Sequence, residues 1–359
     1  MDTLQVWRDL HWLIHSPNLL SANARLPLAH WPDDMLRQAD DWLGQEYHKP
    51  EHLRPDVADG YRRLGLYAEA LLGLALQHVK DLELLAAHTP VHTEAEPEQP
   101  GSVRRTLGEL DFVFRDRDSG QVCHWELAVK LYLFVPALPA AMGLARYVGL
   151  QQRDTLARKT AKLQEQLHFS SLPQVTQKLG VSVERAEAFV KGWLFYPLQG
   201  AGWNDYLPDD HAGTDMLDAA HLKGWWMSHN QFVQRLTQLK DTTLRWRIVP
   251  RLQWLSPQVA EHQDTMDSTQ LLKALRDWFE AKDSKFPGNP AESQDVPTQT
   301  APIPTRTPSA PGRPRPGLLI VALAPVGEPA VGIADYAEAH RGFVVANDWE
   351  ERLLTAPPR

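Results

Sequence analysis

The chain has 359 residues, a formal net charge of −8, and 43% hydrophobic against 23% charged residues. This length and composition are typical of a globular protein of about two domains or one large domain, which buries a core without disulfides or structural metals. No apolar run reaches the roughly 20 residues of a transmembrane helix, so we expect no membrane partner. The single cysteine, Cys123, excludes an internal disulfide framework and favours a reducing, cytoplasmic location. The acidic charge argues against a surface that binds nucleic acid everywhere, but it allows a local basic patch.

The first part of the chain is predicted to be helical. Apolar residues from Leu4 to Ile14 recur at helical spacing, and a second helix is expected from Met35 to Glu46. A longer helix is expected from about Asp59 to Val79, where leucines, alanines and Tyr67 form a wide apolar stripe.

The hydrophobic period then changes from helix to strand. Residues 82–91, 108–115 and 122–134 read as three strands in series, and RDSG at 117–120 is a turn signal between the last two. Strands that follow a long helix predict an α/β or α+β core, a mixed sheet flanked by helices.

The remaining chain mixes both periods. Helices are predicted at 151–167, 172–191 (split near Gly180) and 271–282, and strands, several of them rich in Trp, at 193–198, 222–228 and 245–257. Residues 286–317 contain nine prolines and almost no large apolar residue, so we expect this linker to be disordered, with a structured segment after it that adds a strand or forms a small appendage. The expected parts are N-terminal helices (1–58), an α/β core (59–200), a Trp-rich extension (201–285), the linker (286–316) and a C-terminal segment (317–359).

Acidic residues follow the predicted strands at positions where a core would carry apolar side chains. Glu109 and Asp111 share one face of the strand 108–115, because residues two apart in a strand point the same way. Glu126 and Lys130 likewise share a face of the strand 122–134. A short turn joins the two strands and could place Asp111 beside Glu126, which would make an oxygen-rich site suited to Mg²⁺ or Mn²⁺. A lysine on the same face can orient water or hold a phosphate.

This order of residues resembles the PD-(D/E)XK nuclease superfamily. That pattern has a helix with a glutamate, a hairpin strand with a metal-binding aspartate, a strand with E-x-K, and a helix with basic or amide residues. The matching pieces here are RRLGLYAEALLGLAL, LGELDFVF, HWELAVK and LQQRDTLARKTAKLQEQL. The resemblance covers about residues 60–198 and implies a PD-(D/E)XK-like core, with Glu69, Asp111 and Glu126 as metal ligands and Lys130 as the catalytic lysine.

One position departs from the family pattern. The lysine of E-x-K would stand at residue 128, which is Ala128 in this chain, and Lys130 lies two residues further on. The displacement is roughly 7 Å along a strand, a distance that a long side chain can bridge.

The chain as a whole is also similar to a family of bacterial proteins, the domain of unknown function 1853. The stretches RDLHWLIHSPNLL, GELDF, WELAVKLYL and WRIVPRLQWLSP carry this similarity. It implies no established activity beyond the nuclease-like core.

The function expected from these residues is metal-dependent hydrolysis of phosphodiester bonds in DNA. Asp111 and Glu126 would hold one or two divalent cations, with Glu69 and the carbonyl of Leu127 completing the ligands, and Lys130 would position the attacking water. Basic residues on the helix 151–167 would contact backbone phosphates, and these are Arg158, Lys159 and Lys162. Segment 101–191 has 13 Lys/Arg and 9 Asp/Glu, a local balance of +4.

Other interpretations stay open at this stage. The protein could be a catalytically inactive member of this fold that binds nucleic acid or a protein. A protein partner would bind through the C-terminal segment. His124 could reach the metal, although a structural histidine is the stronger interpretation. Tryptophans in the strands could stack on bases, but burial in the core is the commoner role of such residues. These tryptophans are Trp193, Trp225, Trp226, Trp246 and Trp254.

Overall fold

The computed structural model describes most of the chain and divides it into two compact units. The described residues are 3–49, 53, 63–92, 106–207, 214–239, 243–280, 315–326 and 335–356. The first unit comprises Met1–Leu194 and Asp209–Lys223, and the second comprises Phe195–Pro208 and Gly224–Arg359. Most of the predicted Pro-rich linker lies outside the described residues.

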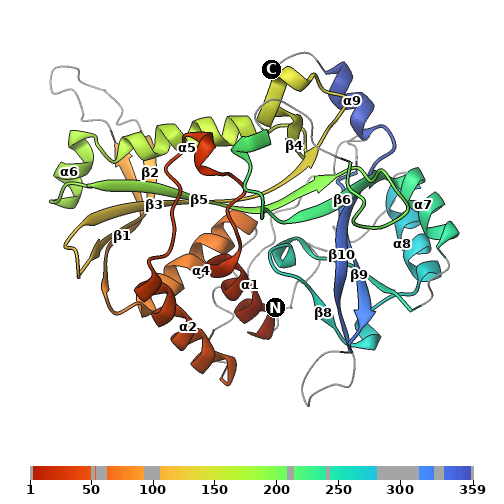
Figure 1. Cartoon of the computed structure of the whole chain (residues 1–359), viewed down its shortest axis with the longest axis horizontal. Helices are drawn as coiled ribbons and strands as arrows, with labels where there is room; N and C mark the ends of the chain where they lie inside the picture. The colour runs from red at the N-terminus through yellow and green to blue at the C-terminus, as the bar shows by residue number, and fades with distance from the viewer. Residues whose placement is uncertain are drawn as a thin grey trace, which may run out of the picture. The chain divides into compact units, whose positions relative to one another are not determined.

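Both units mix helices with strands, which confirms the α/β class (Figure 1). The first unit contains α1 (Thr3–His15), α2 (Asp33–Tyr47), α4 (Leu64–His78), β1 (Leu82–His92), β2 (Thr106–Asp116), β3 (Val122–Phe134), β4 (Tyr147–Gly149), α5 (Leu156–Phe169), α6 (Pro173–Leu179) and most of β5 (Arg185–Tyr196). The second contains β6 (Lys223–Ser228), α7 (His229–Gln238), β7 (Arg245–Ile248), β8 (Val259–Ala260), α8 (Ser268–Glu280), β9 (Leu318–Pro325), β10 (Tyr336–Val345) and α9 (Trp349–Thr355).

The sheet of the first unit has the strand order β1-β2-β3-β5, with β4 paired to β3. The pairs β1–β2, β2–β3 and β3–β4 are antiparallel. In Figure 1, α5 lies along one face of this sheet and α1, α2 and α4 lie along the other. Helices therefore cover both faces, and polar side chains on the strands can meet residues of α5 or α4.

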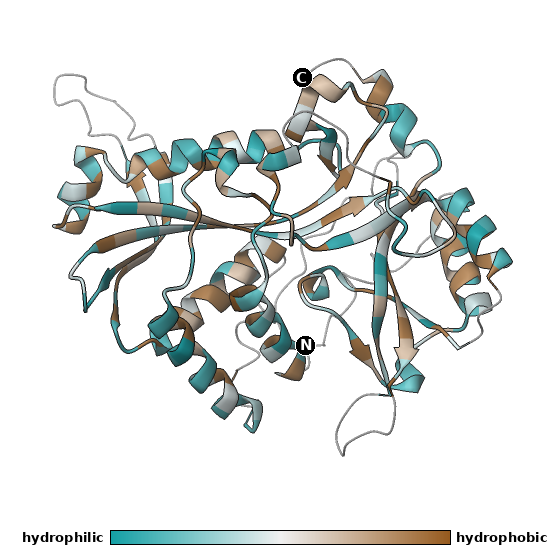
Figure 2. Ribbon diagram, viewed as in Figure 1, coloured by the Kyte–Doolittle hydropathy of each residue, from teal (hydrophilic) through white to brown (hydrophobic). Residues whose placement is uncertain are grey.

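The apolar character of α4 explains its central place. Its residues Leu64, Tyr67, Leu71, Leu72 and Leu76 are buried, and the helix is largely brown in the hydropathy colours of Figure 2. The buried hydroxyl of Tyr67 donates a hydrogen bond to Asp9 of α1 at 3.0 Å, which satisfies a carboxylate that is fully buried. Alternation of hydrophilic and hydrophobic residues around α5 in Figure 2 marks it as an amphipathic helix.

The second unit is built on the strand order β6-β10-β9-β7, with β8 paired to β10. Strand β10 is parallel to β6 and antiparallel to β9. Aromatic residues fill the core between this sheet and α7 and α8, and the largest are Trp225, Phe232, Trp246 and Trp278. Of the two roles expected for the C-terminal segment, the structure shows the first, because β9 and β10 are strands of this sheet.

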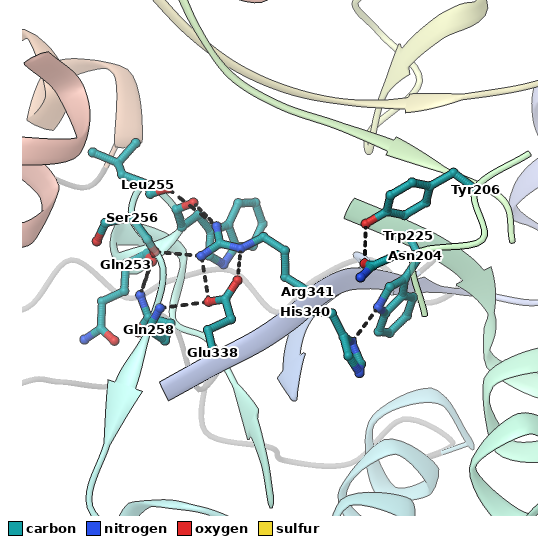
Figure 3. A network of polar contacts seen from close by, with 11 residues as sticks. Asn204, Tyr206, Trp225, Gln253, Leu255, Ser256, Gln258, Glu338, His340 and Arg341 are labelled. Carbon is teal, nitrogen blue, oxygen red and sulfur yellow. Dashed lines mark hydrogen bonds and ion pairs between the residues drawn. The ribbon is translucent and has the colours of Figure 1, made fainter. Parts of the chain in front are cut away.

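A buried ion pair fixes the loop before β8 against β10 (Figure 3). The guanidinium of Arg341 donates hydrogen bonds to both carboxylate oxygens of Glu338, at 2.6 and 2.8 Å. It also donates to the carbonyls of Trp254 and Ser256, and the N–H of Gln258 donates to Glu338. Backbone groups of residues 254–258 form hydrogen bonds with both members of this ion pair. The pair therefore serves as a structural clamp on that segment.

Two local predictions are wrong. The expected second half of the helix 172–191 is instead the start of β5, because Gly180 takes the left-handed conformation (φ +71°) that ends α6. The strand expected to run to residue 257 ends at Ile248, since Pro250 lacks the N–H group that a strand ladder needs. Helix α7 was missed, although Ser228 and Gln231 form a capping box at its start.

Candidate functional site

Asp111 and Glu126 meet where the backbone pairing of β2 and β3 ends. The ladder runs from Arg115↔Val122 to Phe112↔Trp125, so Asp111 and Glu126 are the next opposed residues. At this point carboxylate oxygens, rather than backbone carbonyls, accept the backbone N–H groups of the opposite strand. The Leu127 N–H donates to Asp111 Oδ2 at 2.9 Å, and the Asp111 N–H donates to Glu126 Oε1 at 3.4 Å. The structure therefore brings the two predicted ligands together in the gap between the strands.

Residues from β3 and α5 hold the carboxylate of Glu126. Its Oε1 lies 3.0 Å from Nε2 of His124, and its Oε2 accepts a hydrogen bond from Gln166 at 2.8 Å. The other ring nitrogen of His124, Nδ1, is hydrogen-bonded to the hydroxyl of Ser170. His124 is fully buried, and burial lowers its pKa to about 4, so the neutral ring donates to Glu126. The histidine is structurally satisfied, as expected, and it also orients a candidate ligand.

Burial disfavours the charged forms of Asp111, Glu126 and Glu69. Burial raises the pKa of Asp111 to about 7, and repulsion from the Glu126 carboxylate adds to the shift. Burial likewise raises the pKa of Glu126 to about 7. For Glu69 on α4, burial and then repulsion from Asp111 raise the pKa to about 7. Three acids held this way would be stabilised by a cation among them.

Glu69 belongs to the wider surroundings of the pair rather than to its direct contacts. Its Oε2 lies 3.7 Å from Nδ1 of His88, which lies 3.9 Å from Glu109 Oε1. His88 is opposite Asp111 in the β1–β2 register and has a positive φ of 46°, unusual for a residue other than glycine. Glu109 is half exposed, so it lies at the rim of the group.

Lys130 forms an ion pair with a different carboxylate, that of Asp154. Its Nζ donates to Oδ2 of Asp154 at 2.9 Å, and the Tyr132 hydroxyl donates to the same oxygen at 3.0 Å. Ala128, at the position where E-x-K would place its lysine, is buried. Asp154 was not singled out from the sequence, because it lies 24 residues after Lys130 and only the fold brings the two together.

The three basic residues predicted to bind nucleic acid occupy different environments on α5. Arg158 and Lys162 are exposed. Lys159 is half-buried, and its ammonium interacts electrostatically with Glu126, Asp111 and Lys130. Burial lowers the pKa of Lys159, and the two carboxylates oppose this shift. Lys159 thus differs from Arg158 and Lys162 in burial and in its interaction with the acids. Its spacing of seven residues from Gln166 places the two residues on one face of α5.

The three acids do not form a closed cage of ligand atoms. Among the described residues, the group whose carboxylate oxygens all lie within 4.8 Å of one another is Asp34, Asp81 and Asp118, a surface trio from α2 and two turns. Asp111, Glu126 and Glu69 are therefore not among the residues whose ligand atoms meet this distance criterion.

The Trp-rich strands supply core rather than a stacking surface. Trp193, Trp225, Trp226 and Trp246 are all buried, and Trp254 donates its indole N–H to the Val249 carbonyl. Cys123 is buried and free. None of the helices in the described part of the chain is both long and apolar enough to cross a membrane.

Comparison with known proteins gives one finding about the whole chain. The family model of the domain of unknown function 1853 (DUF1853) matches residues 8–345. No curated protein and no solved structure matches the chain.

Proposed function

The chain belongs to the family of the domain of unknown function 1853, and we propose that this member is a metal-dependent nuclease that hydrolyses phosphodiester bonds in DNA. The observation that carries the proposal is the buried Asp111–Glu126 pair in the gap between β2 and β3. Two acids with raised pKa values, side by side and held by N–H donors, are an arrangement that stability alone does not favour.

The donor set fits a hard divalent cation. Carboxylate oxygens such as those of Asp111 and Glu126 are ligands that Mg²⁺ and Mn²⁺ prefer, and the Leu127 carbonyl and Glu69 would complete the set. A cation bound there would lower the pKa of a water molecule and offset negative charge on the phosphate. The resemblance to the PD-(D/E)XK superfamily, in the order Glu69, Asp111, Glu126, supports the same chemistry.

The chain's own groups orient the ligands and the substrate. His124 and Gln166 fix the Glu126 carboxylate, and the Leu127 N–H fixes Asp111. The exposed Arg158 and Lys162 are available for backbone phosphates of the nucleic acid. In the reaction, a water oxygen bonds to phosphorus, the P–O ester bond breaks, and the leaving oxygen takes up a proton.

Cleavage assays test this function. Linear duplex, single-stranded and branched DNA would be incubated with the wild type in Mg²⁺, in Mn²⁺ and in EDTA, beside Asp111→Asn and Glu126→Gln. We expect metal-dependent cleavage that falls at least about 100-fold in each variant. Glu165→Gln, at an exposed acid of α5, is the matched control and should cleave normally. Cleavage that persists in both site variants would contradict the proposal.

A second candidate function is binding of nucleic acid or a protein without cleavage. Ala128 at the lysine position of the motif favours it, as does the full set of N–H partners on Glu126. A folded wild type that binds DNA in an electrophoretic shift assay and cleaves none of the substrates would establish this function instead.

A further inference from the structure

The nuclease proposed above needs a positive charge at the scissile phosphate, and the E-x-K position provides none, because residue 128 is alanine. Resting on that function, we propose that Lys159 of α5, and not Lys130 of β3, supplies the ammonium group that contacts the scissile phosphate. This assignment moves the catalytic lysine from the strand to the helix that packs over it.

Lys130 has another role in the structure. Its ammonium pairs with Asp154 at 2.9 Å, and Tyr132 donates to the same carboxylate oxygen, so the charge of Lys130 is compensated locally. Contact with a phosphate beside Asp111 would require Lys130 to leave this partly buried pair. Lys130 therefore serves to anchor Asp154 at the start of α5.

One face of α5 already belongs to the site. Gln166 donates to Glu126 at 2.8 Å, and Ser170, just after the helix, is hydrogen-bonded to His124. Lys159 precedes Gln166 by seven residues, which is two helical turns or roughly 10 Å along the axis, and so lies on the same face. Arg158 and Lys162 are exposed.

The Lys159 ammonium interacts electrostatically with both acids and is not hydrogen-bonded to either. Within the described residues no hydrogen bond or ion pair fixes its Nζ, whereas its electrostatic interactions include both Glu126 and Asp111. A flexible cation beside two acids, half-buried and without a fixed partner, can donate to a non-bridging oxygen of a bound phosphate. Its charge would stabilise the extra negative charge that this group carries as the water attacks.

The test separates catalysis from binding. Single-turnover cleavage rates at saturating enzyme would be compared for Lys159→Met, Lys130→Met and Lys162→Met, with Lys80→Met, at an exposed lysine outside the site, as the control. DNA affinity would be measured by fluorescence anisotropy with the same substitutions in a Glu126→Gln background, which prevents cleavage. We expect Lys159→Met to lower the saturated rate about 100-fold with little change in Kd, Lys162→Met to raise Kd, and Lys80→Met to change neither.

Two further readouts address folding and placement. A lysine restored to the motif position, as Ala128→Lys in the Lys159→Met background, should recover part of the rate if the charge itself is what was lost. Removal of the Lys159 charge should also tighten Mn²⁺ binding several-fold in calorimetry, and Lys162→Met should not, because Lys159, unlike Lys162, interacts electrostatically with both acids.

Three results would overturn the assignment. The rate could depend on Lys130 and not on Lys159, which would restore the strand lysine. Lys159→Met could weaken DNA binding as Lys162→Met does and spare the saturated rate, which would make Lys159 a backbone contact. Absence of cleavage in the folded wild type would instead refute the nuclease function itself and, with it, any catalytic lysine.

Discussion

Asp111 and Glu126 perform two tasks with the same atoms. Each accepts a backbone N–H from the opposite strand, in the positions where carbonyl groups would continue the ladder. Each also sits in a nearly closed environment, with Asp111 9% and Glu126 1% exposed. The pair thus joins the strands, and its burial raises the pKa of each acid to about 7, a cost that a bound cation would offset.

This cost predicts a pH dependence of stability in the metal-free protein. The folded-state pKa of Asp111, about 7, is above the unfolded value, so its contribution is full at low pH and is lost as pH rises through 7. Between pH 5 and pH 8 in EDTA, the wild type should lose about 3 kcal/mol more unfolding free energy than Asp111→Asn, by urea denaturation. Equal pH profiles would contradict the account of this pair.

The sequence allowed the prediction of the acids but not of their partners. Alternation along two strands joined by a short turn was enough to place Asp111 near Glu126. The partners come from afar: Gln166 is 40 residues from Glu126, and Ser170 is 46 residues from His124. Nothing local to Lys130 indicates Asp154, so its ion pair could not be foreseen.

Hydrophobic periodicity predicted the helices and strands that have one apolar face, and it gave the wrong type for a segment that is buried on both faces. Helices α1, α2 and α4 and strands β1 to β3 lie close to their predicted ranges. The start of β5 was read as helix, because Ala188, Phe189 and Val190 are all buried and show no alternation. Tertiary packing, rather than local pattern, makes this segment a strand.

Packing of β5 against the end of α1 buries Lys191. Its Nζ donates to the carbonyl of Ser16, and the residue is 4% exposed. Burial lowers the pKa of Lys191 to about 8, and Asp218 opposes the shift only in part. The contact caps the C-terminal end of α1, where a positive charge is favourable.

The buried lysine predicts the opposite pH trend. Because its folded-state pKa lies below the unfolded value of about 10.4, the stability penalty of the charged form disappears as pH rises above 8. From pH 7.5 to 9.5 the wild type should gain about 2 kcal/mol relative to Lys191→Met in chemical denaturation. The comparison with the Met variant removes the contribution of other groups that titrate in this range, and parallel curves would show that Lys191 is not buried as described.

For the whole molecule, the order of predicted helices and strands correctly indicated the α/β class, and the structure has two compact units. The boundaries of these units could not be read from the chain, since the second is made of residues 195–208 together with 224–359. Strands β9 and β10 follow the Pro-rich segment and still complete the sheet of this unit, a long-range pairing that no local signal shows. The buried Trp225–His340 hydrogen bond and the Arg341 clamp depend on that pairing (Figure 3).

The charge of the whole molecule also bears on function. The net charge is −8, yet segment 101–191 has a balance of +4 and contains both the acids and α5. A substrate with a phosphate backbone would therefore meet its favourable potential on this segment rather than over the whole surface.

Calorimetric titration of Mn²⁺ and Mg²⁺ measures directly whether Asp111 and Glu126 bind a divalent cation. The wild type would be compared with the Asp111→Asn/Glu126→Gln double variant and with Asp34→Asn, which controls for the surface trio of acids, each shown to be folded by circular dichroism. We predict that the wild type binds the metal, that the double variant loses this binding, and that Asp34→Asn retains it. A folded wild type that binds neither ion, or binding that depends on Asp34 and not on Asp111 and Glu126, would contradict the metal site between β2 and β3.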